Sequence, residues 1–380
     1  MPSSPDSPVV LQVLPSLITG GVERGTVEIT QAIVEGEATA LVTSAGGPLV
    51  RQIERAGGEH ITLPLTTKSP LGIWRNAAAL EALIRDRKVS IVHARSRAPA
   101  WSAWLACQRT GVPFVTTYHG TYTEGLPFKR LYNSVMARGR IVIAASHFIA
   151  DLVAERHKIA PARIRVIPRG VDPAVFDPTT VPGSRIARLA AEWRLPDGVR
   201  TVVLPGRLTS WKGHSVLLDA VARLGRPDVM CVFVGSHQGR RGYARSLEEQ
   251  ATRLGIAEQL RLVGQCDDMP AAMCLSDVVV HASIEPEAFG RVVIEAQAMG
   301  RPVIASDLGG PVETVRHGET GWRVRPNDPD ALAAAIAVAL DLSPEERLAL
   351  GQRARASVPT VRAMQDATLD VYEAVLTGKA

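Results

Sequence analysis

Two kinds of apolar pattern alternate along this chain of 380 residues. Short runs rich in valine and isoleucine, typical of buried strands, are followed by longer segments whose apolar residues recur every three or four positions, as in a helix packed on a sheet. In the first half, strands are predicted near residues 9–14, 40–43, 61–63, 91–93, 114–118, 141–144 and 165–167. In the second half, they are predicted near residues 201–204, 229–234, 260–263, 278–282, 302–305 and 321–324. This repeated order predicts the α/β class, with two Rossmann-like domains built on parallel sheets.

A segment dense in turn formers, from Pro168 to Gly183, separates the two halves. The length also exceeds the roughly 250–300 residues at which one hydrophobic core stops growing, so two domains are expected. Beyond Pro326 the pattern is helical, with a break before the last helical segment, 361–376. The predicted organisation is a disordered lead-in at 1–8, an N-terminal domain at 9–175, an interdomain linker at 176–196, a C-terminal domain at 197–358, and a C-terminal helix at 359–380 that crosses back onto the first domain.

The composition limits which classes of binding partner and which cellular compartment fit this chain. With 46% hydrophobic and 21% charged residues, the chain has an ordinary globular composition. No apolar run approaches the ~18 residues of a membrane-spanning helix. The four cysteines form no Cys-x-x-Cys pair, which argues against a zinc site or a disulfide framework and favours the reducing cytoplasm. The net charge of +5 favours anionic partners, and because no nucleic-acid-binding motif is present, a phosphorylated substrate or an anionic membrane fits better.

The segment from Glu287 to Glu295 holds the clearest candidate chemistry. It follows an apolar strand and opens a helix, so it is expected at the carboxyl end of a strand, where open α/β sheets bind ligands. The turn and the first helical positions are Phe289, Gly290, Arg291 and Val292. Their backbone N–H groups would be available to a diphosphate, while Glu287 would face sugar hydroxyls and Glu295 a ribose diol. The alternative is a capped helix with two surface carboxylates.

Loops after other predicted strands carry further candidates, each with a structural alternative. Gly20 and Gly21 let the backbone approach a ligand, as a plain turn also would, and they lack the third glycine of a dinucleotide fingerprint, which argues against a dehydrogenase. His119 is either a ligand-binding imidazole at the sheet rim or a structural histidine. Arg207 and Lys212, five positions apart, suit a pyrophosphate, although surface cations are common.

Together these motifs resemble those of the retaining glycosyltransferases of family four, which have the GT-B fold of two facing Rossmann-like domains. The resemblance runs from about Val9 to Leu376. The segments that carry it are Gly20-Gly21, Val166 to Asp172, Gly206-Arg207-Leu208, Trp211-Lys212-Gly213, Leu262-Val263-Gly264, the Glu287 to Glu295 block and Gly300 to Ala305. One departure is Arg169, where the family usually carries Asn, so the contact made by that Asn is not carried over.

The resemblance implies a role for each candidate. Arg207 and Lys212 would hold the donor diphosphate and stabilise its charge as it leaves. Glu295 would bind the ribose, while Glu287 and the backbone after Phe289 would hold the transferred sugar. The remaining donor contacts would come from Gly20, Gly21, Val263, Gly264 and Gln265, with His119 against the sugar. The resemblance also implies retention of the anomeric configuration, with a donor phosphate oxygen taking the acceptor proton.

Asp328 and Asp330 match the Asp-x-Asp letters of metal-dependent sugar transferases. Pro329 and the helical pattern behind it indicate a helix N-terminus instead, where acidic residues are favourable. With Arg207 and Lys212 available to neutralise a diphosphate, no metal and no other cofactor is expected.

Two first-half segments are candidates for the acceptor side. Arg95 and Arg97 follow a predicted strand and would suit a phosphate or carboxylate on the acceptor. Residues 126–140 mix bulky apolar and basic side chains. This segment either rests on an anionic bilayer or turns Phe128, Leu131, Tyr132 and Val135 towards the core.

The sequence therefore predicts a cytoplasmic transferase, with peripheral contact to an anionic membrane as a further expectation. It would move a hexose of the mannose, glucose or galactose type from a UDP- or GDP-sugar to a lipid-linked or saccharide acceptor, in lipopolysaccharide or other cell-envelope glycan synthesis by analogy with similar enzymes. Two alternatives stay open: a sugar-nucleotide 2-epimerase of the same architecture, and a non-catalytic sugar-nucleotide-binding protein. The paired acids and histidines of the first are not evident, and donor turnover would exclude the second.

Overall fold

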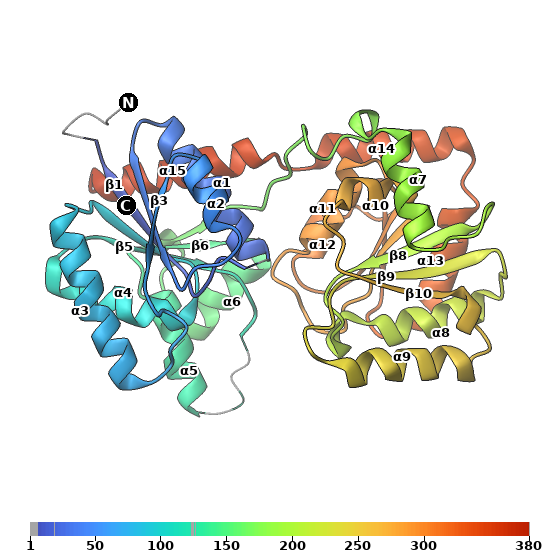
Figure 1. Ribbon diagram of the computed structural model, residues 1–380, viewed down its shortest axis with the longest axis horizontal. Helices are drawn as coiled ribbons and strands as arrows, with labels where there is room; N and C mark the ends of the chain where they lie inside the picture. Colours follow the sequence, from blue (N-terminus) through green and yellow to red (C-terminus); the bar gives the residue numbers. More distant parts are fainter. Residues whose placement is uncertain (1–6, 19, 123–124, 126, 380) are drawn as a thin grey trace. The chain divides into compact units, whose positions relative to one another are not determined.

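The computed structural model describes residues 7–18, 20–122, 125 and 127–379, so most of the predicted lead-in at 1–8 lies outside the described residues. The chain divides into two compact units, one of Met1–Pro168 with Val361–Ala380 and one of Arg169–Thr360. Each unit is a parallel β-sheet with helices on both faces (Figure 1). The α/β class and the two parallel sheets predicted from the sequence are confirmed.

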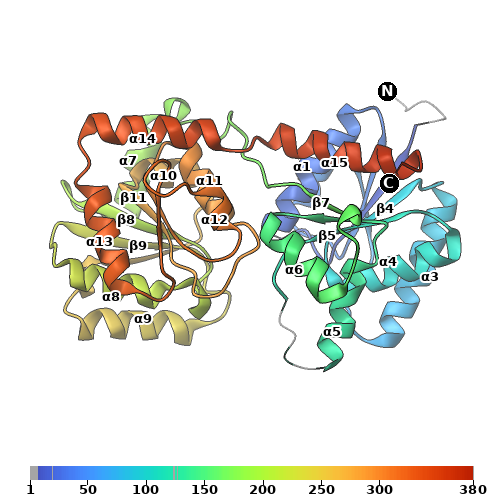
Figure 2. The same ribbon diagram turned by 180° about the vertical axis from the view of Figure 1, so that it is seen from behind.

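The first unit contains a sheet in the order β3-β2-β1-β4-β5-β6-β7. Its strands are β1 (Val9–Val13), β2 (Thr39–Ser44), β3 (Glu59–Thr62), β4 (Ile91–Ala94), β5 (Phe114–Tyr118), β6 (Ile141–Ala144) and β7 (Ile164–Val166). Its helices are α1 (Gly21–Glu35), α2 (Val50–Arg55), α3 (Pro70–Asp86), α4 (Arg97–Thr110), α5 (Pro127–Ser134), α6 (His147–His157) and α15 (Val361–Leu376). Helices α1 and α15 cover one face of the sheet, and α3 and α4 the other (Figure 2).

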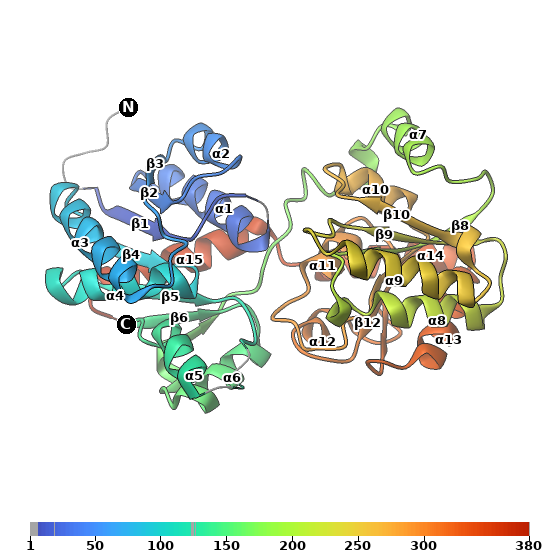
Figure 3. The same cartoon turned by 60° about the horizontal axis from the view of Figure 1, so that its bottom comes forward.

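The second unit contains a sheet in the order β10-β9-β8-β11-β12-β13. Its strands are β8 (Arg200–Pro205), β9 (Val229–Val234), β10 (Leu260–Gly264), β11 (Val278–His281), β12 (Val303–Ser306) and β13 (Trp322–Val324). Its helices are α7 (Gly183–Glu192), α8 (His214–Leu224), α9 (Arg241–Arg253), α10 (Met269–Leu275), α11 (Arg291–Ala298), α12 (Pro311–Thr314), α13 (Pro329–Leu340) and α14 (Pro344–Ser357). Helices α8 and α9 lie on one face of the sheet, and α10 and α11 on the other (Figure 3).

The last helix, α15, completes the core of the first unit. Its residues Met364, Val371 and Val375 pack with the buried side chains of α1 and of strands β1, β4 and β6. Tyr372 Oη lies 2.6 Å from His93 Nδ1, and His93 Nε2 lies 2.6 Å from Thr117 Oγ1. Helix α15 is therefore bound to the first unit by apolar packing and by a buried hydrogen-bonded chain.

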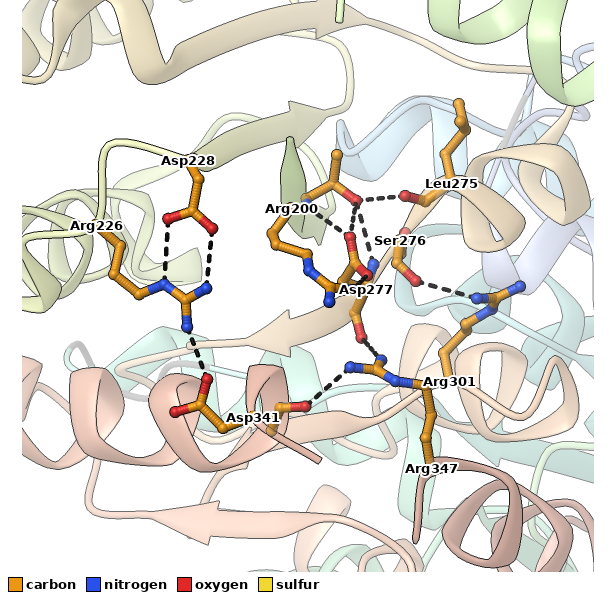
Figure 4. A network of polar contacts seen from close by, with 11 residues as sticks. Arg200, Arg226, Asp228, Leu275, Ser276, Asp277, Arg301, Asp341 and Arg347 are labelled. Carbon is orange, nitrogen blue, oxygen red and sulfur yellow. Dashed lines mark hydrogen bonds and ion pairs between the residues drawn. The ribbon is translucent and has the colours of Figure 1, made fainter. Parts of the chain in front are cut away.

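A polar network joins the amino ends of β8 and β11 in the second unit (Figure 4). Asp277 pairs with Arg200 at 3.0 Å and accepts from the backbone N–H of Thr201 at 2.8 Å. The carbonyl oxygen of Asp277 accepts from Arg347 at 2.8 Å, which ties α14 to the same point. The amino edge of the sheet is thus cross-linked by polar contacts, while the candidate residues lie at the opposite, carboxyl edge.

The boundary between the units differs from the sequence-based expectation. The first unit ends at Pro168 and not at residue 175. Much of the expected linker at 176–196 belongs to the second unit, where Pro182 is the N-cap of α7. Arg185 of α7 forms two hydrogen bonds, of 2.9 and 2.6 Å, with Asp268 at the start of α10. Proline and glycine here begin a packed helix, because proline is tolerated at a helix start.

Candidate active site

The carboxyl edge of the second sheet brings three of the predicted loops together. The loop after β8 carries Arg207 and Lys212, the end of β10 carries Val263 to Gln265, and the loop after β11 carries Glu287. Strands β8 and β11 are neighbours, and β9 separates β8 from β10. Because all strands are parallel, their carboxyl ends meet at one edge, where open α/β folds bind ligands.

The loop after β8 closes onto the chain after β11. Trp211 accepts a hydrogen bond through its carbonyl oxygen from the backbone N–H of Ile284, at 2.8 Å. Gly213 has a positive φ of 74°, and a Cβ at this residue would lie 1.9 Å from the carbonyl oxygen of Ala282. Only glycine fits this approach, which sets Lys212 beside the residues that follow β11.

Lys212 and Glu287, two of the predicted catalytic residues, form an ion pair of 2.6 Å. The same carboxylate oxygen, Glu287 Oε1, accepts from Ser283 Oγ and lies 2.7 Å from His281 Nε2. Burial by itself would raise the pKa of Glu287, but the electrostatic attraction of His281 and Lys212, with the hydrogen bonds they donate, holds that pKa well below the usual glutamate range. Glu287 is therefore ionised at neutral pH.

A second charged pair lies at the start of α11. Arg291 Nε donates to Glu295 Oε1 at 3.0 Å, one turn along the helix, and Glu295 is only 5% exposed. Gly290 is the N-cap of α11 in the left-handed conformation, and no side chain caps this helix. A Cβ at Gly290 would lie 2.7 Å from Pro311 Cγ. The predicted turn into a helix is confirmed, and its two glutamates are bound to cations within the protein.

The remaining second-unit candidates surround this edge without bonding to one another. Arg207 is exposed, and Gln265 is exposed with its amide 3.2 Å from Asp267 Oδ1. Gly264 ends β10 with a φ of 72°, while Phe289 is buried. Val263 and Val292 are partly exposed. The structure thus joins Lys212 to Glu287 and Arg291 to Glu295, and leaves Arg207 and Gln265 open to solvent.

The first-unit candidates lie at the carboxyl edge of the other sheet, after β1, β4 and β5. Helix α1 begins at Gly21, and Gly20 before it has a φ of 150°; a Cβ there would lie 2.4 Å from Glu23 Oε2. His119 follows β5 directly and is partly buried. Glycine at position 20 therefore lets the Glu23 carboxylate approach the start of α1.

The two arginines after β4 have different surroundings. Arg95 is only 2% exposed, and its Nη1 donates to Gln12 Oε1 at 2.9 Å. Burial lowers the pKa of this guanidinium. Arg97 donates to Asn133 Oδ1 at 2.8 Å, and its guanidinium carbon lies 4.0 Å from the centre of the Tyr122 ring. Arg95 therefore does not present its charge at the surface for an acceptor, whereas Arg97 is partly exposed.

The Asp-x-Asp sequence forms a helix start, as predicted. Asp328 Oδ1 accepts from the backbone N–H of Ala331 at 2.9 Å and so caps α13. Asp330 pairs with Arg223 at 2.6 Å. Within the part of the chain that the structure describes, no three His, Cys, Asp or Glu side chains are grouped so that they would hold a metal ion.

Sequence reasoning missed His281 and Ser283, both of which are buried and bind Glu287. The available signal was the two-residue alternation that runs through β11 and the two residues after it, with Val278, Val280 and Ala282 apolar and His281 and Ser283 polar. A histidine at the end of an otherwise apolar strand is easily taken for a core residue.

Two parallel-sheet units, with paired charges at a sheet edge, agree with the GT-B architecture, and comparison with known proteins identifies the family. The chain belongs to the glycosyltransferases: residues 186–357 match the family described as Glycosyl transferases group 1, and residues 19–175 match Glycosyltransferase Family 4. The resemblance noted in the sequence is thereby confirmed.

Individual relatives agree with this assignment. A D-inositol 3-phosphate glycosyltransferase of Jonesia denitrificans is 32% identical over 329 residues, which are 80% of this chain and 74% of the relative. A crystal structure of a glycosyltransferase from Rickettsia africae has a TM-score of 0.89 at 36% identity, covering 98% of this chain and 99% of the other. Anabaena HepE in complex with UDP-glucose has a TM-score of 0.82 at 25% identity, covering 96% and 99%.

Proposed function

We propose that this glycosyltransferase moves a hexose from a UDP- or GDP-sugar to a hydroxyl of a lipid-linked or saccharide acceptor, with retention of configuration and without a metal ion. The hexose is of the mannose, glucose or galactose type, and the product belongs to lipopolysaccharide or another cell-envelope glycan. The observation that carries the proposal is the Lys212–Glu287 ion pair at the carboxyl edge of the second sheet, with the Arg291–Glu295 pair on the helix beside it.

This arrangement suits a sugar diphosphate. Lys212 and the exposed Arg207 supply positive charge for the diphosphate, and the uncapped start of α11 supplies backbone N–H groups. Glu287 accepts from sugar hydroxyls and Glu295 from the ribose. Donor-side electrostatics of this kind need no metal, because the side chains themselves neutralise the leaving group.

The state of Glu287 supports retention through attack on the same face that the diphosphate leaves. Its lowered pKa keeps the carboxyl ionised, so it has no proton to give to a leaving group. Three donors also hold Oε1, which makes that oxygen a poor nucleophile and leaves Oε2 to contact the sugar. A donor phosphate oxygen then takes the acceptor proton, which leaves Glu287 the role of orienting the sugar.

The acceptor side is less specified. The name of the Jonesia relative contains D-inositol 3-phosphate, a phosphorylated polyol, and Arg97 of this chain is a partly exposed cation after a first-unit strand. We infer an acceptor that carries a negative charge near its reacting hydroxyl.

Helix α5 supports contact with an anionic membrane on the cytoplasmic side. Phe128 is 83% exposed and Leu131 is 60% exposed, with the exposed cations Lys129 and Arg130 between them. The interpretation of these apolar residues as core is therefore wrong for Phe128 and Leu131, and holds for Val135, which is buried. No helix within the described residues is long and apolar enough to cross a bilayer.

Two tryptophans of α4 extend this surface. Arg138 lies over both, with its guanidinium carbon 4.4 Å from the Trp104 ring centre and 5.3 Å from that of Trp101. Trp101 Nε1 donates to the carbonyl oxygen of Tyr132 in α5 at 3.1 Å, so the two helices adjoin. Aromatic and basic side chains together are typical of surfaces at the headgroup level of a bilayer.

Sedimentation with vesicles tests this surface. The protein should bind vesicles containing phosphatidylglycerol and not vesicles of phosphatidylcholine alone, and a Phe128→Ser, Leu131→Ser variant should lose binding. Equal recovery of the variant and the parent with anionic vesicles would contradict the membrane role.

A thermal-shift screen of nucleoside diphosphates, followed by product analysis, tests the transferase proposal. The cognate nucleotide should raise the melting temperature, because a ligand that binds only the folded state stabilises it. Incubation with UDP-glucose, UDP-galactose and GDP-mannose should then release the nucleoside diphosphate. Conversion of the sugar to its 2-epimer would show an epimerase instead, and binding without turnover would show a non-catalytic protein.

A further inference from the structure

Glu287 is held through only one of its two carboxylate oxygens. Oε1 lies 2.6 Å from Lys212 Nζ and 2.7 Å from His281 Nε2, and it also accepts from Ser283 Oγ. Oε2 takes part in none of these three hydrogen bonds, and the side chain is 15% exposed. Because three donors occupy Oε1, the acceptor capacity that remains on this carboxylate is at Oε2.

The geometry of β11 brings His281 and Ser283 to this oxygen. Val278, Val280 and Ala282 pack into the apolar core of the second unit. Since side chains alternate between the two faces of a strand, His281, the last residue of β11, points to the opposite face, and Ser283, two residues beyond the strand, contacts the same carboxylate oxygen. Both are buried, and a buried polar side chain needs a hydrogen-bond partner. The carboxylate of Glu287 is that partner for both.

The backbone at Glu287 is fixed as well. Gly310 donates its N–H to the carbonyl oxygen of Glu287 at 2.8 Å. A Cβ at Gly309 would lie 2.6 Å from that oxygen, and one at Gly310 would lie 2.3 Å from the carbonyl oxygen of Ala288. The main chain is thus packed against two glycines, so the direction of the Glu287 side chain depends on what holds its carboxylate.

We propose that His281 and Ser283 are positioning residues, which fix Glu287 through Oε1 so that Oε2 alone accepts a hydroxyl of the transferred sugar. This rests on the proposed function, in which Lys212 binds the donor diphosphate. When the donor draws Lys212 towards its phosphates, Oε1 loses one of its three partners. His281 and Ser283 then keep the carboxylate in place during transfer.

The imidazole acts through a single nitrogen. A carboxylate can only accept, so His281 Nε2 carries a proton and donates it to the hydrogen bond. Nδ1 is buried and has no hydrogen-bond partner among the described residues. Glutamine places a side-chain N–H at a similar distance from the backbone, so His281→Gln keeps the donor, whereas His281→Leu removes it and keeps the bulk.

Donor hydrolysis measures the positioning role without knowledge of the acceptor. UDP-glucose and GDP-mannose are assayed in parallel for release of nucleoside diphosphate, and calorimetry gives the affinity for UDP and GDP. His281→Leu should lower kcat about 100-fold, because a displaced catalytic contact can cost that much. The kcat of His281→Gln should be at least about tenfold higher than that of His281→Leu. Ser283→Ala should lower kcat about tenfold, as expected for the loss of one hydrogen bond to a charged group.

The matched control is Ser306→Ala, because Ser306 is equally buried at the end of the neighbouring strand β12. It should keep the kcat of the parent, and no variant should change nucleoside diphosphate affinity by more than about twofold, since the sugar contact alone is affected. Adding His281→Leu to Glu287→Gln should cost nothing further, because residues that act through one group are not additive.

The outcomes separate this proposal from the proposed function. If Glu287→Gln lowers kcat while His281→Leu does not, the function stands and the positioning role is wrong. The positioning role is also wrong if His281→Leu lowers kcat and melting temperature and His281→Gln restores neither, since His281 is then structural. If Glu287→Gln leaves kcat unchanged, the proposed function itself fails.

Discussion

The carboxyl edges of the two sheets carry positive charge in different ways. In the second unit Lys212 and Arg291 each pair with a carboxylate, at 2.6 and 3.0 Å. In the first unit Arg95 donates a hydrogen bond to the side-chain amide oxygen of Gln12. Arg97 donates to the side-chain oxygen of Asn133 and lies over the ring of Tyr122. Neither of these arginines forms an ion pair with a described carboxylate, although Glu23 and Glu28 attract Arg95 through space.

This difference indicates how each unit would meet an anion. At the second edge a diphosphate would replace Glu287 as the anionic partner of Lys212, so binding at this lysine would exchange one ion pair for another, while the exposed Arg207 would gain a partner. At the first edge Arg97 is partly exposed and is held by neutral groups, so an arriving anion would meet a positive charge that no described carboxylate pairs with. The second edge therefore suits a donor that must be held and then released, and the first suits recruitment of a charged acceptor.

The largest expected effect comes from removing Lys212, the lysine that pairs with Glu287 at the carboxyl edge of the second sheet. Lys212→Ala should lower transfer by roughly 100- to 1000-fold, as loss of one charge-stabilising donor at a leaving group does. It also leaves the buried Glu287 carboxylate with fewer partners, so melting temperatures should be measured beside rates. The control is Lys379→Ala at an exposed position of the first unit. Parent-level activity in Lys212→Ala would show that this lysine is only a structural cation.

Substitution of the two glutamates at the second edge, Glu287 and Glu295, should impair different properties of the enzyme. Glu295→Gln removes the charge that accepts from the ribose, so calorimetry should show nucleoside diphosphate affinity falling by about 1.5–3 kcal/mol. Glu287→Gln should leave that affinity nearly unchanged and lower turnover by about 100-fold, because the sugar is misplaced. Glu285→Gln, which changes an exposed neighbour, is the control. The opposite pattern would reverse the two roles.

A smaller effect should appear in acid. The folded-state pKa of Glu287 is below the unfolded value of about 4.3, so its contribution to stability is present above that pH and lost as the pH falls towards the folded pKa. The parent protein should therefore lose more stability between about pH 5 and pH 3 than Glu287→Gln, by at least about 1 kcal/mol. If the two proteins lost the same amount of stability over this pH range, Glu287 would not be ion-paired in solution and the prediction would be wrong.

The smallest effect should come from chelation. If the diphosphate charge is met by Lys212, Arg207 and the start of α11, as proposed, activity in EDTA should stay within about twofold of the untreated rate. If EDTA abolished activity and Mg²⁺ or Mn²⁺ restored it, the side chains of the second edge would not be enough to neutralise the diphosphate, and the metal-independent proposal would be wrong. Sensitivity to salt, in contrast, should be greater for acceptor binding than for donor binding, because Arg97 has no ion-pair partner among the described residues, whereas Lys212 and Arg291 each pair with a carboxylate.

Much of the fold was predictable because buried parallel strands are apolar on both faces and short. Each strand predicted from an apolar run is present, with ends that differ by a residue or two. The last helix was placed correctly at 361–376 because Pro359 interrupts the helical pattern before it. The linker at 176–196 was misjudged because Pro182 and Gly183 look like a turn and instead start α7.

The site was predictable as a set of loops but not as a set of bonds. Parallel topology places Arg207, Lys212 and Glu287 at one edge whatever their contacts are. The Lys212–Glu287 pair joins residues 75 positions apart, and local pattern carries no information on such a contact. Arg95 was expected to meet an acceptor because it follows a predicted strand, but its guanidinium is buried and donates to Gln12, a contact 83 positions away that the local pattern does not reveal.

The return of α15 to the first unit has a consequence for synthesis. The ribosome completes the whole second unit, Arg169–Thr360, before it adds the helix whose Met364, Val371, Tyr372 and Val375 belong to the first core. The N-terminal unit is made first but is the last to have all of its core residues, whereas the C-terminal unit is continuous in sequence and can fold as its residues emerge. Until α15 arrives, the apolar side chains of Ile29 and Ile33 on α1 lack part of their cover, so the nascent chain has an exposed apolar surface that a chaperone would bind.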